Sequence, residues 1–152
     1  MRDKEELERL YRLHFRTVWN LCLTFLREPA DAEDAVQETF LRLAREDRAF
    51  ESEEHVKAWL IRMAKNVCRD ELRRWRRKEL PLDEARNAAA PAPEIDETLA
   101  AVRSLPEKYR TAIYLYYYEG LPVERISRLL DRRESTVRSD LRRGREALKK
   151  LL

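Results

Sequence analysis

Residues 120–148, GLPVERISRLLDRRESTVRSDLRRGREAL, contain the pattern that decides the fold of the C-terminal part of this chain. Gly120 and Pro122 favour the end of one helix and the start of the next. Two runs of apolar residues then recur at helical spacing: Val123, Ile126, Leu129 and Leu130, followed by Val137, Leu141, Leu148 and Leu151. A polar break at 131–133 separates the runs, so the pattern predicts a helix-turn-helix.

The second of these helices has an outer face of cations and hydroxyl groups: Ser135, Thr136, Arg138, Ser139, Arg142, Arg143 and Arg145. A helix that enters the major groove of DNA needs such side chains, because Arg reads guanine edges or neutralises phosphates. We therefore interpret these residues as candidate DNA contacts. A helical hairpin with a basic, solvated face is the alternative.

The segment before the helix-turn-helix is also predicted to be helical. A short helix is expected near 95–103, and Ser104-Leu-Pro-Glu107 matches the Ser-x-x-Glu capping box of a helix start. The helix that follows is predicted to face the core with Tyr109, Ala112, Ile113 and Tyr116. The tyrosines of 114–118 are interpreted as half-buried supports without chemistry.

Residues 79–95, ELPLDEARNAAAPAPEI, differ in composition from the chain on either side. Three prolines and a run of alanines predict an extended linker. No strand pattern occurs elsewhere. We therefore expect an all-α protein with two small domains, residues 1–78 and 96–152, joined by a flexible linker.

The first domain is predicted to hold three helices. The first carries an apolar stripe of Leu7, Leu10, Tyr11, His14, Val18, Leu21, Cys22 and Phe25. Pro29 interrupts this stripe, and Asp31 is placed to cap a second helix whose apolar face includes Ala35 and Phe40. The opposite face of that helix shows Asp34, Gln37, Glu38 and Leu41. An exposed Leu among polar groups is ordinary, but it is also typical of a partner surface.

Residues 44–54 lose this periodicity and indicate a loop with one aromatic residue, Phe50. The third helix is predicted to bury Leu60, Met63, Ala64 and Val67, and to expose Arg62, Lys65, Asn66, Arg69 and Arg73 on its opposite face. Basic groups can follow phosphates, while neighbouring rings can hold unstacked bases. We interpret Trp59 as a core residue, whereas Trp75 fits the core and a nucleic-acid contact equally well.

Charge is unevenly distributed in this chain of 152 residues, whose net charge is only +3. Residues 62–78 hold eight basic and two acidic side chains, and residues 121–152 hold ten and five. More acidic segments separate the two. This arrangement favours two separate contacts with a polyanion, although a charged run is more often a solvated face.

The residue content argues against an enzyme, a cofactor or a metal centre. The chain has no Gly-rich phosphate loop, nucleophile–base pair or carboxylate dyad. Cys22 and Cys68 occupy apolar helical positions and are interpreted as reduced core thiols, and His14 and His55 lack further ligands at metal-binding spacing. No apolar run approaches the roughly 18 residues that span a bilayer, so we expect a cytoplasmic protein without membrane insertion.

Three segments resemble, in chain order, parts of bacterial sigma factors. Residues 31–43, DAEDAVQETFLRL, resemble the polymerase-binding helix, and residues 58–74, AWLIRMAKNVCRDELRR, resemble the promoter-melting helix. Residues 104–148 resemble the C-terminal helix-turn-helix. Their order and spacing are similar to those of the compact extracytoplasmic-function (ECF) group of the sigma-70 superfamily, which has only these two domains. The resemblance implies a transcription initiation factor that binds bacterial RNA polymerase core and promoter DNA.

The resemblance also implies roles for individual residues. The polymerase clamp would be bound by Asp34, Gln37, Glu38, Leu41 and Arg42. The minus-ten promoter element would be bound by Arg62, Lys65, Asn66, Arg69 and Arg73, with the loop 47–55, which contains Phe50, capturing a flipped base. The minus-35 element would be read by the second domain. The acidic linker groups Asp83, Glu84, Glu94 and Asp96 would either mimic nucleic acid or belong to a plain tether.

Some positions depart from the family pattern. Asp131 and Arg132 stand where a Gly and an apolar residue are usual, Arg133 replaces the usual Ser cap, and Asp140 occupies a position often held by a cation. Asp140 could repel phosphates, accept a hydrogen bond from cytosine, or pair with Arg143 or Arg133. These departures bear on DNA preference more than on DNA binding.

Two other functions compete with this reading. One is a stand-alone helix-turn-helix regulator that binds duplex operators, and the other is a helical adaptor whose basic faces meet an acidic protein. Members of the ECF group commonly have an anti-sigma factor, but no residue of this chain identifies one. We expect the free protein to be a monomer.

Overall fold

The computed structural model describes residues 2–78 and 97–152, with side chains except those of residues 75–78. Every regular element in these ranges is helical, which confirms the all-α prediction. The contacts divide the chain into two compact units, Met1–Ala92 and Pro93–Leu152. The expected linker, residues 79–95, lies outside the described residues, as do its acidic groups and Asp96.

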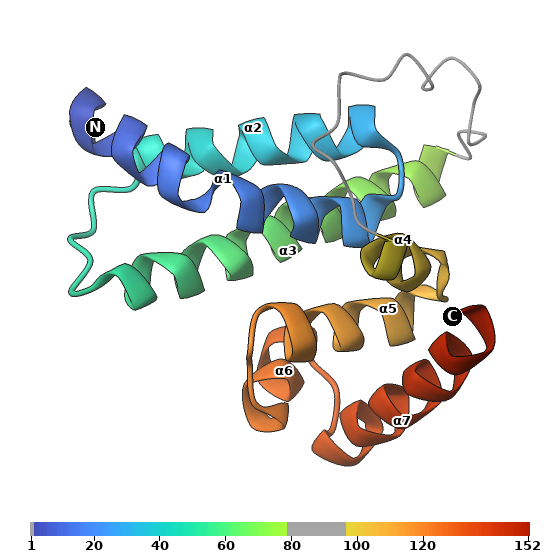
Figure 1. The fold of residues 1–152 in the computed structure, drawn as a ribbon. Coiled ribbons are helices and arrows are strands. Elements are labelled where there is room, and N and C mark those ends of the chain that lie inside the picture. Colours follow the sequence, from blue (N-terminus) through green and yellow to red (C-terminus); the bar gives the residue numbers. More distant parts are fainter. Residues whose placement is uncertain (1, 79–96) are drawn as a thin grey trace. The chain divides into compact units, whose positions relative to one another are not determined.

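The first unit consists of three packed helices, α1 (Lys4–Leu26), α2 (Pro29–Arg45) and α3 (Glu53–Lys78) (Figure 1). Their shared core buries most of the residues that the apolar stripes identified, because each stripe repeats at the helical period. Tyr11 is an exception: it lies at the edge of its stripe, is 43% exposed, and its ring contacts that of Phe40 edge-on.

The turn between α1 and α2 differs from the prediction. Arg27 has a positive φ of 66°, and Pro29 is the first residue of α2. Proline is favoured there, because an N–H group at the first helical position has no partner within the helix and proline has none to lose. Asp31 is therefore not the cap; it is buried in the first turn of α2.

Cys22 and Cys68 lie in the core of the first unit as free, buried cysteines, as expected. Burial raises the pKa of the Cys68 thiol, and a contact with Cys22 raises it further. A buried thiol with a raised pKa carries little of the reactive thiolate.

The second unit contains α4 (Glu97–Ser104), α5 (Glu107–Ile113), η2 (Tyr114–Tyr118), α6 (Val123–Leu130) and α7 (Glu134–Leu151). The predicted capping box is wrong. Ser104 is the last residue of α4, where its hydroxyl donates to the carbonyl of Ala101, and Pro106 precedes the first residue of α5.

A π-helical turn changes which tyrosines face the core. In η2 the N–H of Glu119 donates to the carbonyl of Tyr114, five residues earlier. This wider turn shifts the helical register, so that Tyr114 and Leu115 are buried and Tyr116 is 39% exposed. The prediction that Tyr116 faces the core is therefore wrong.

The helix-turn-helix is present as predicted. Asp131 ends α6 in the left-handed conformation, with φ 54° and ψ 47°, which explains why a Gly is usual at this position. Asp adopts this conformation more readily than most other residues. Ile126, Leu129, Leu130, Val137 and Leu141 are buried, whereas Leu151, expected inward, is 56% exposed in the last turn of α7.

The close approach of α7 to α5 depends on Gly144. A Cβ atom at this position would lie 2.7 Å from Cγ1 of Ile113. Gly144 therefore allows the two helices to pack at a distance that any other residue would increase.

Candidate nucleic-acid interface

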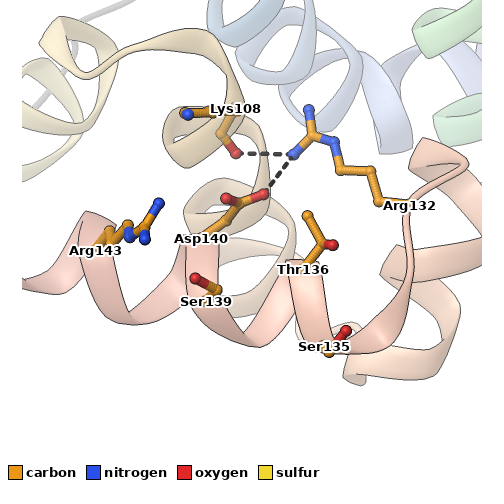
Figure 2. Close-up of a pocket in the computed structure, with 7 residues that line it drawn as sticks. All are labelled: Lys108, Arg132, Ser135, Thr136, Ser139, Asp140 and Arg143. Carbon is orange, nitrogen blue, oxygen red and sulfur yellow. Dashed lines mark hydrogen bonds and ion pairs between the residues drawn. The ribbon is translucent and has the colours of Figure 1, made fainter.

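The outer face of α7 presents most of the predicted contact residues to solvent. Ser135, Thr136, Arg138, Arg142 and Arg143 are exposed, and Ser139 is half-buried. Five polar side chains of α7 border an open cleft of about 510 Å³, together with one residue of α5 and one of the turn (Figure 2). The residues of this cleft are Lys108, Arg132, Ser135, Thr136, Ser139, Asp140 and Arg143.

The cations of this face are not neutralised by strong internal pairs. Arg138 lies 3.4 Å from Glu134, but both side chains are more than half exposed, and such surface pairs contribute little. Among the described residues, no carboxylate lies within ion-pair distance of Arg142 or Arg143. The guanidinium groups are therefore available to an external anion.

Asp140 does not lie among these exposed groups. Its carboxylate points to Arg132, whose Nη1 lies 3.2 Å from Oδ2 of Asp140 (Figure 2). The same nitrogen donates to the carbonyl of Lys108 in α5 at 2.9 Å. The expected partners of Asp140, Arg143 or Arg133, are wrong, and its burial argues against a contact with cytosine or phosphate.

Arg145 lies apart from the cleft. Its Nη1 donates to the hydroxyl of Tyr117 at 3.2 Å, and it borders a second, more apolar groove with Tyr118 and Leu148. Arg145 therefore lies outside the first cleft, as do Arg138 and Arg142.

A second cationic face lies on α3. Arg62 and Arg73 are exposed, and Asn66 and Arg69 are half-buried. Arg73 lies 3.7 Å from Asp70 in an exposed pair. Lys65 departs from the prediction: it is only 8% exposed, because it lies at the edge of this face beside the buried Ile61.

The loop before α3 carries Phe50 next to this face. The ring of Phe50 contacts His55 and Trp59 edge-on, with centroid distances of 5.2 Å and 5.9 Å. Trp59 is half-buried, so its interpretation as a core residue is wrong: it joins an aromatic cluster at the surface. The side chain of Trp75 lies outside the described residues.

The loop is shorter than the sequence indicated. Helix α3 begins at Glu53, and the hydroxyl of Ser52 accepts a hydrogen bond from the N–H of His55. Such a bond caps the helix N-terminus.

The residues predicted as a partner surface lie on the solvent-facing side of α2. Asp34 and Gln37 are exposed, Leu41 is 49% exposed, and Arg42 pairs with Glu38 at 3.2 Å. Beside this face, α1 and α2 border a groove of about 660 Å³. Its residues are Lys4, Leu7, Glu8, Tyr11, Gln37, Phe40, Leu41 and Ala44.

No group of three or more His, Cys, Asp or Glu side chains is placed to hold a metal ion in residues 2–78 and 97–152. Within the same ranges, the helices lack the length and apolar character needed to cross a membrane.

Comparison with protein families matches both units. Residues 10–78 match the family described as Sigma-70 region 2, and residues 95–148 match Sigma-70, region 4. The matches thus include α3 with its cationic face and the helix-turn-helix with α7.

Individual relatives are similar over nearly the whole chain. The chain is 30% identical to the ECF RNA polymerase sigma factor SigM of Mycobacterium tuberculosis (strain H37Rv), over 99% of this chain and 79% of that protein. It is 29% identical to the sigma factor SigM of Bacillus subtilis, over 95% and 94% of the two chains. The fold is similar to that of a chain in the complex of the sigma factor RpoE with the anti-sigma factor NepR from Bartonella quintana. That match has a TM-score of 0.74 and 22% identity, and it covers 97% of this chain and 96% of the other.

Proposed function

The chain belongs to the ECF group of the sigma-70 family, and we propose that its two units divide the recognition of a promoter between them. It is a promoter-specific sigma factor of bacterial RNA polymerase. The family consists of initiation factors that are not enzymes, and we propose that this chain likewise acts by binding alone. We also propose that it acts in the cytoplasm, where the polymerase works.

The exposed face of α2 is the proposed contact with the polymerase core. Leu41 offers apolar area that is 49% exposed, with Asp34 and Gln37 beside it. Exposed apolar groups ringed by polar ones are typical of protein interfaces. Glu38 and Arg42 complete the surface, and their mutual pair leaves both side chains partly accessible.

The exposed face of α3 and the neighbouring loop form the proposed minus-ten surface. Arg62, Asn66, Arg69 and Arg73 would follow the phosphates of the melted strand, and Phe50 would stack on an unpaired base. Lys65 contributes less than the sequence suggested, because it is largely buried. Bases captured here offset the cost of unstacking the duplex.

The outer face of α7 is the proposed minus-35 surface. Arg138, Arg142 and Arg143 would reach base edges or phosphates in the major groove, and Ser135, Thr136 and Ser139 would donate shorter hydrogen bonds. Arg145 is proposed to contact DNA only at the margin, since Tyr117 accepts one of its hydrogen bonds.

The observation that carries this proposal is the exposure of Arg62, Arg138 and Arg142 on the outer faces of α3 and α7. Each face is small, so the free protein should bind DNA weakly. Holding both on one polymerase raises the effective concentration of each for the promoter.

Footprinting of the reconstituted holoenzyme tests the division. Arg62→Ala should lose strand opening at the minus-ten element but keep protection at minus-35, because only the first unit contacts the melted strand. Arg142→Ala should lose minus-35 protection first. If each variant weakened both elements equally, the proposed division would be wrong.

The competing function, a stand-alone regulator, is supported by none of the comparisons, since both matching families and the relatives described above are sigma factors. RpoE of Bartonella quintana is bound by NepR in the solved complex. We propose that an anti-sigma factor also controls this chain. Co-purification with the chain would identify that partner.

A further inference from the structure

Arg2 contacts both the end of α2 and the loop between α2 and α3. Its Nε donates to the carbonyl of Leu43 at 3.2 Å. Its Nη2 donates to the carbonyls of Glu46 at 2.8 Å and Arg48 at 2.7 Å. One side chain therefore joins the end of α2 to the middle of the loop.

The position of Arg2 matches what the end of a helix requires. The last carbonyl groups of α2 have no partner within the helix, and a cation near a helix C-terminus is favourable. The backbone N–H of Arg2 also donates to the carbonyl of Ala44 at 2.9 Å. Glu6 holds Nη1 at 3.2 Å, and the Arg2 side chain is only 5% exposed. The guanidinium fork is thus fixed on several sides, in a geometry that Lys cannot reproduce.

The same guanidinium lies against Phe50. Its central carbon is 5.0 Å from the centroid of the Phe50 ring, within the range of a cation–π contact. Trp59 and His55 contact the ring edge-on from α3. Phe50 is nevertheless half-buried rather than enclosed, so part of the ring remains accessible.

We propose that Arg2 is a positioning residue for promoter opening: it clasps the loop of residues 46–52 so that the Phe50 ring is preset to stack on one unpaired base. The inference rests on the proposed role of Phe50 in base capture. A loop that is ordered before the base arrives loses less conformational entropy on binding, which strengthens capture at that base. Arg2 itself contacts no DNA in this account.

The test uses the full chain with core polymerase and a promoter selected from genomic fragments, in which each minus-ten base is removed in turn to leave an abasic site. Discrimination at a position is then the preference for the base over the abasic site, because any base can stack on a ring. Phe50→Ala should abolish discrimination at one position, which identifies the captured base. Arg2→Met should lower discrimination at that same position about tenfold, the order of one base–ring stack, and leave the other positions unchanged. Arg12→Met is the matched control, because Arg12 is 77% exposed and, within the described part of the chain, forms an ion pair only with Glu8 on its own helix.

A purely structural role predicts a different result, namely an equal loss at every minus-ten position. That pattern would overturn the inference, as would unchanged discrimination by Arg2→Met where Phe50→Ala has an effect. If Phe50→Ala changes discrimination at none of the minus-ten positions, the base-capture proposal is wrong, and the proposed role of Arg2 fails with it.

Folding is checked by circular dichroism. If Arg2→Met does not fold, Arg2→Lys carries the same test, since it keeps the charge but not the fork, and it should lose the same discrimination. Failure of both variants to fold would make Arg2 a folding residue and overturn its assignment.

Discussion

Arg132 in the turn of the helix-turn-helix pairs with Asp140 in α7 across 3.2 Å, and the two side chains are only 18% and 7% exposed. Both residues depart from the family pattern, and the structure shows that they are partners. Arg132 also donates to the carbonyl of Lys108. The pair therefore joins the turn, α7 and α5, and it gives the Asp140 carboxylate a partner within the protein.

Asp140→Ala should destabilise the protein by about 3 kcal/mol, because the largely buried Arg132 guanidinium loses a carboxylate partner. Arg132→Ala should cost a similar amount, and the double variant should cost clearly less than the sum of the two. Urea unfolding of the full chain measures all three. Additive losses would show that the two groups are not coupled.

Gly144→Ala should destabilise the protein despite the helix propensity of Ala. The added Cβ would lie 2.7 Å from Cγ1 of Ile113, and overpacking of this kind costs about 1–3 kcal/mol against a propensity gain of about 1 kcal/mol. Combining Gly144→Ala with Ile113→Ala should remove part of the clash. Thermal unfolding of the single and double variants checks this, and a higher Tm for Gly144→Ala alone would refute it.

Arg138→Ala and Arg142→Ala should each weaken minus-35 recognition about tenfold, since one contact to a base or phosphate contributes about 1–3 kcal/mol. Binding to core polymerase should be unchanged. Promoter-fragment binding by the reconstituted holoenzyme and core-polymerase binding by the same purified variants provide the two measurements. An equal loss in both would show that α7 has another role.

Leu41→Ala should do the reverse and weaken binding to core polymerase about tenfold, as expected for an apolar residue near the centre of an interface. Leu13→Ala is the control, because Leu13 is also an exposed leucine of the first unit, at 56%, and lies outside the α2 face. Surface plasmon resonance with immobilised core polymerase distinguishes them. Equal affinities for the two variants would remove Leu41 from the interface.

Glu53 should make stability fall toward acid pH. A hydrogen bond from Arg9, 2.7 Å away, lowers the pKa of the Glu53 carboxyl below its usual 4.5, and a contact with His14 lowers it further, against the effect of burial. Because this pKa is lower in the folded state, the contribution is present above pH 4.5 and is lost as pH falls through the folded pKa.

The effect should be small, since the Arg9–Glu53 pair is more than half exposed. Glu53→Gln removes the charge, so the stability difference between the two proteins should shrink in acid. Urea unfolding from about pH 3 to about pH 6 measures it. A difference that grows toward acid would contradict the assignment.

The helices and their exposed faces could be predicted because apolar residues repeat at the helical period. Val137 and Leu141 mark the buried side of α7, and the cations opposite follow from that period. The position of the turn at Asp131 could also be predicted, because a three-residue polar break separates the two apolar runs. Periodicity was less reliable at the edges of stripes. Lys65 was expected to be exposed but is buried, and Tyr11 was expected in the core but is exposed.

Contacts between distant residues could not be predicted from spacing. Arg2 reaches carbonyl groups more than forty residues away, and its signal in the sequence is a single cation in a charged segment. The Arg132–Asp140 pair spans a turn, where no helical rule applies. The π-turn of η2 shifts Tyr116 out of the helical register. This shift could not be predicted, because an extra residue in one turn leaves no mark in the apolar pattern.

Run-off transcription with purified chain and bacterial core polymerase, on a genomic fragment library, tests the central claim most directly. The account predicts new transcripts from a small set of fragments that share two elements, and it predicts that Arg62→Ala and Arg142→Ala each lose these transcripts. Transcripts that are absent, or that both variants produce at the level of the unaltered chain, would contradict it.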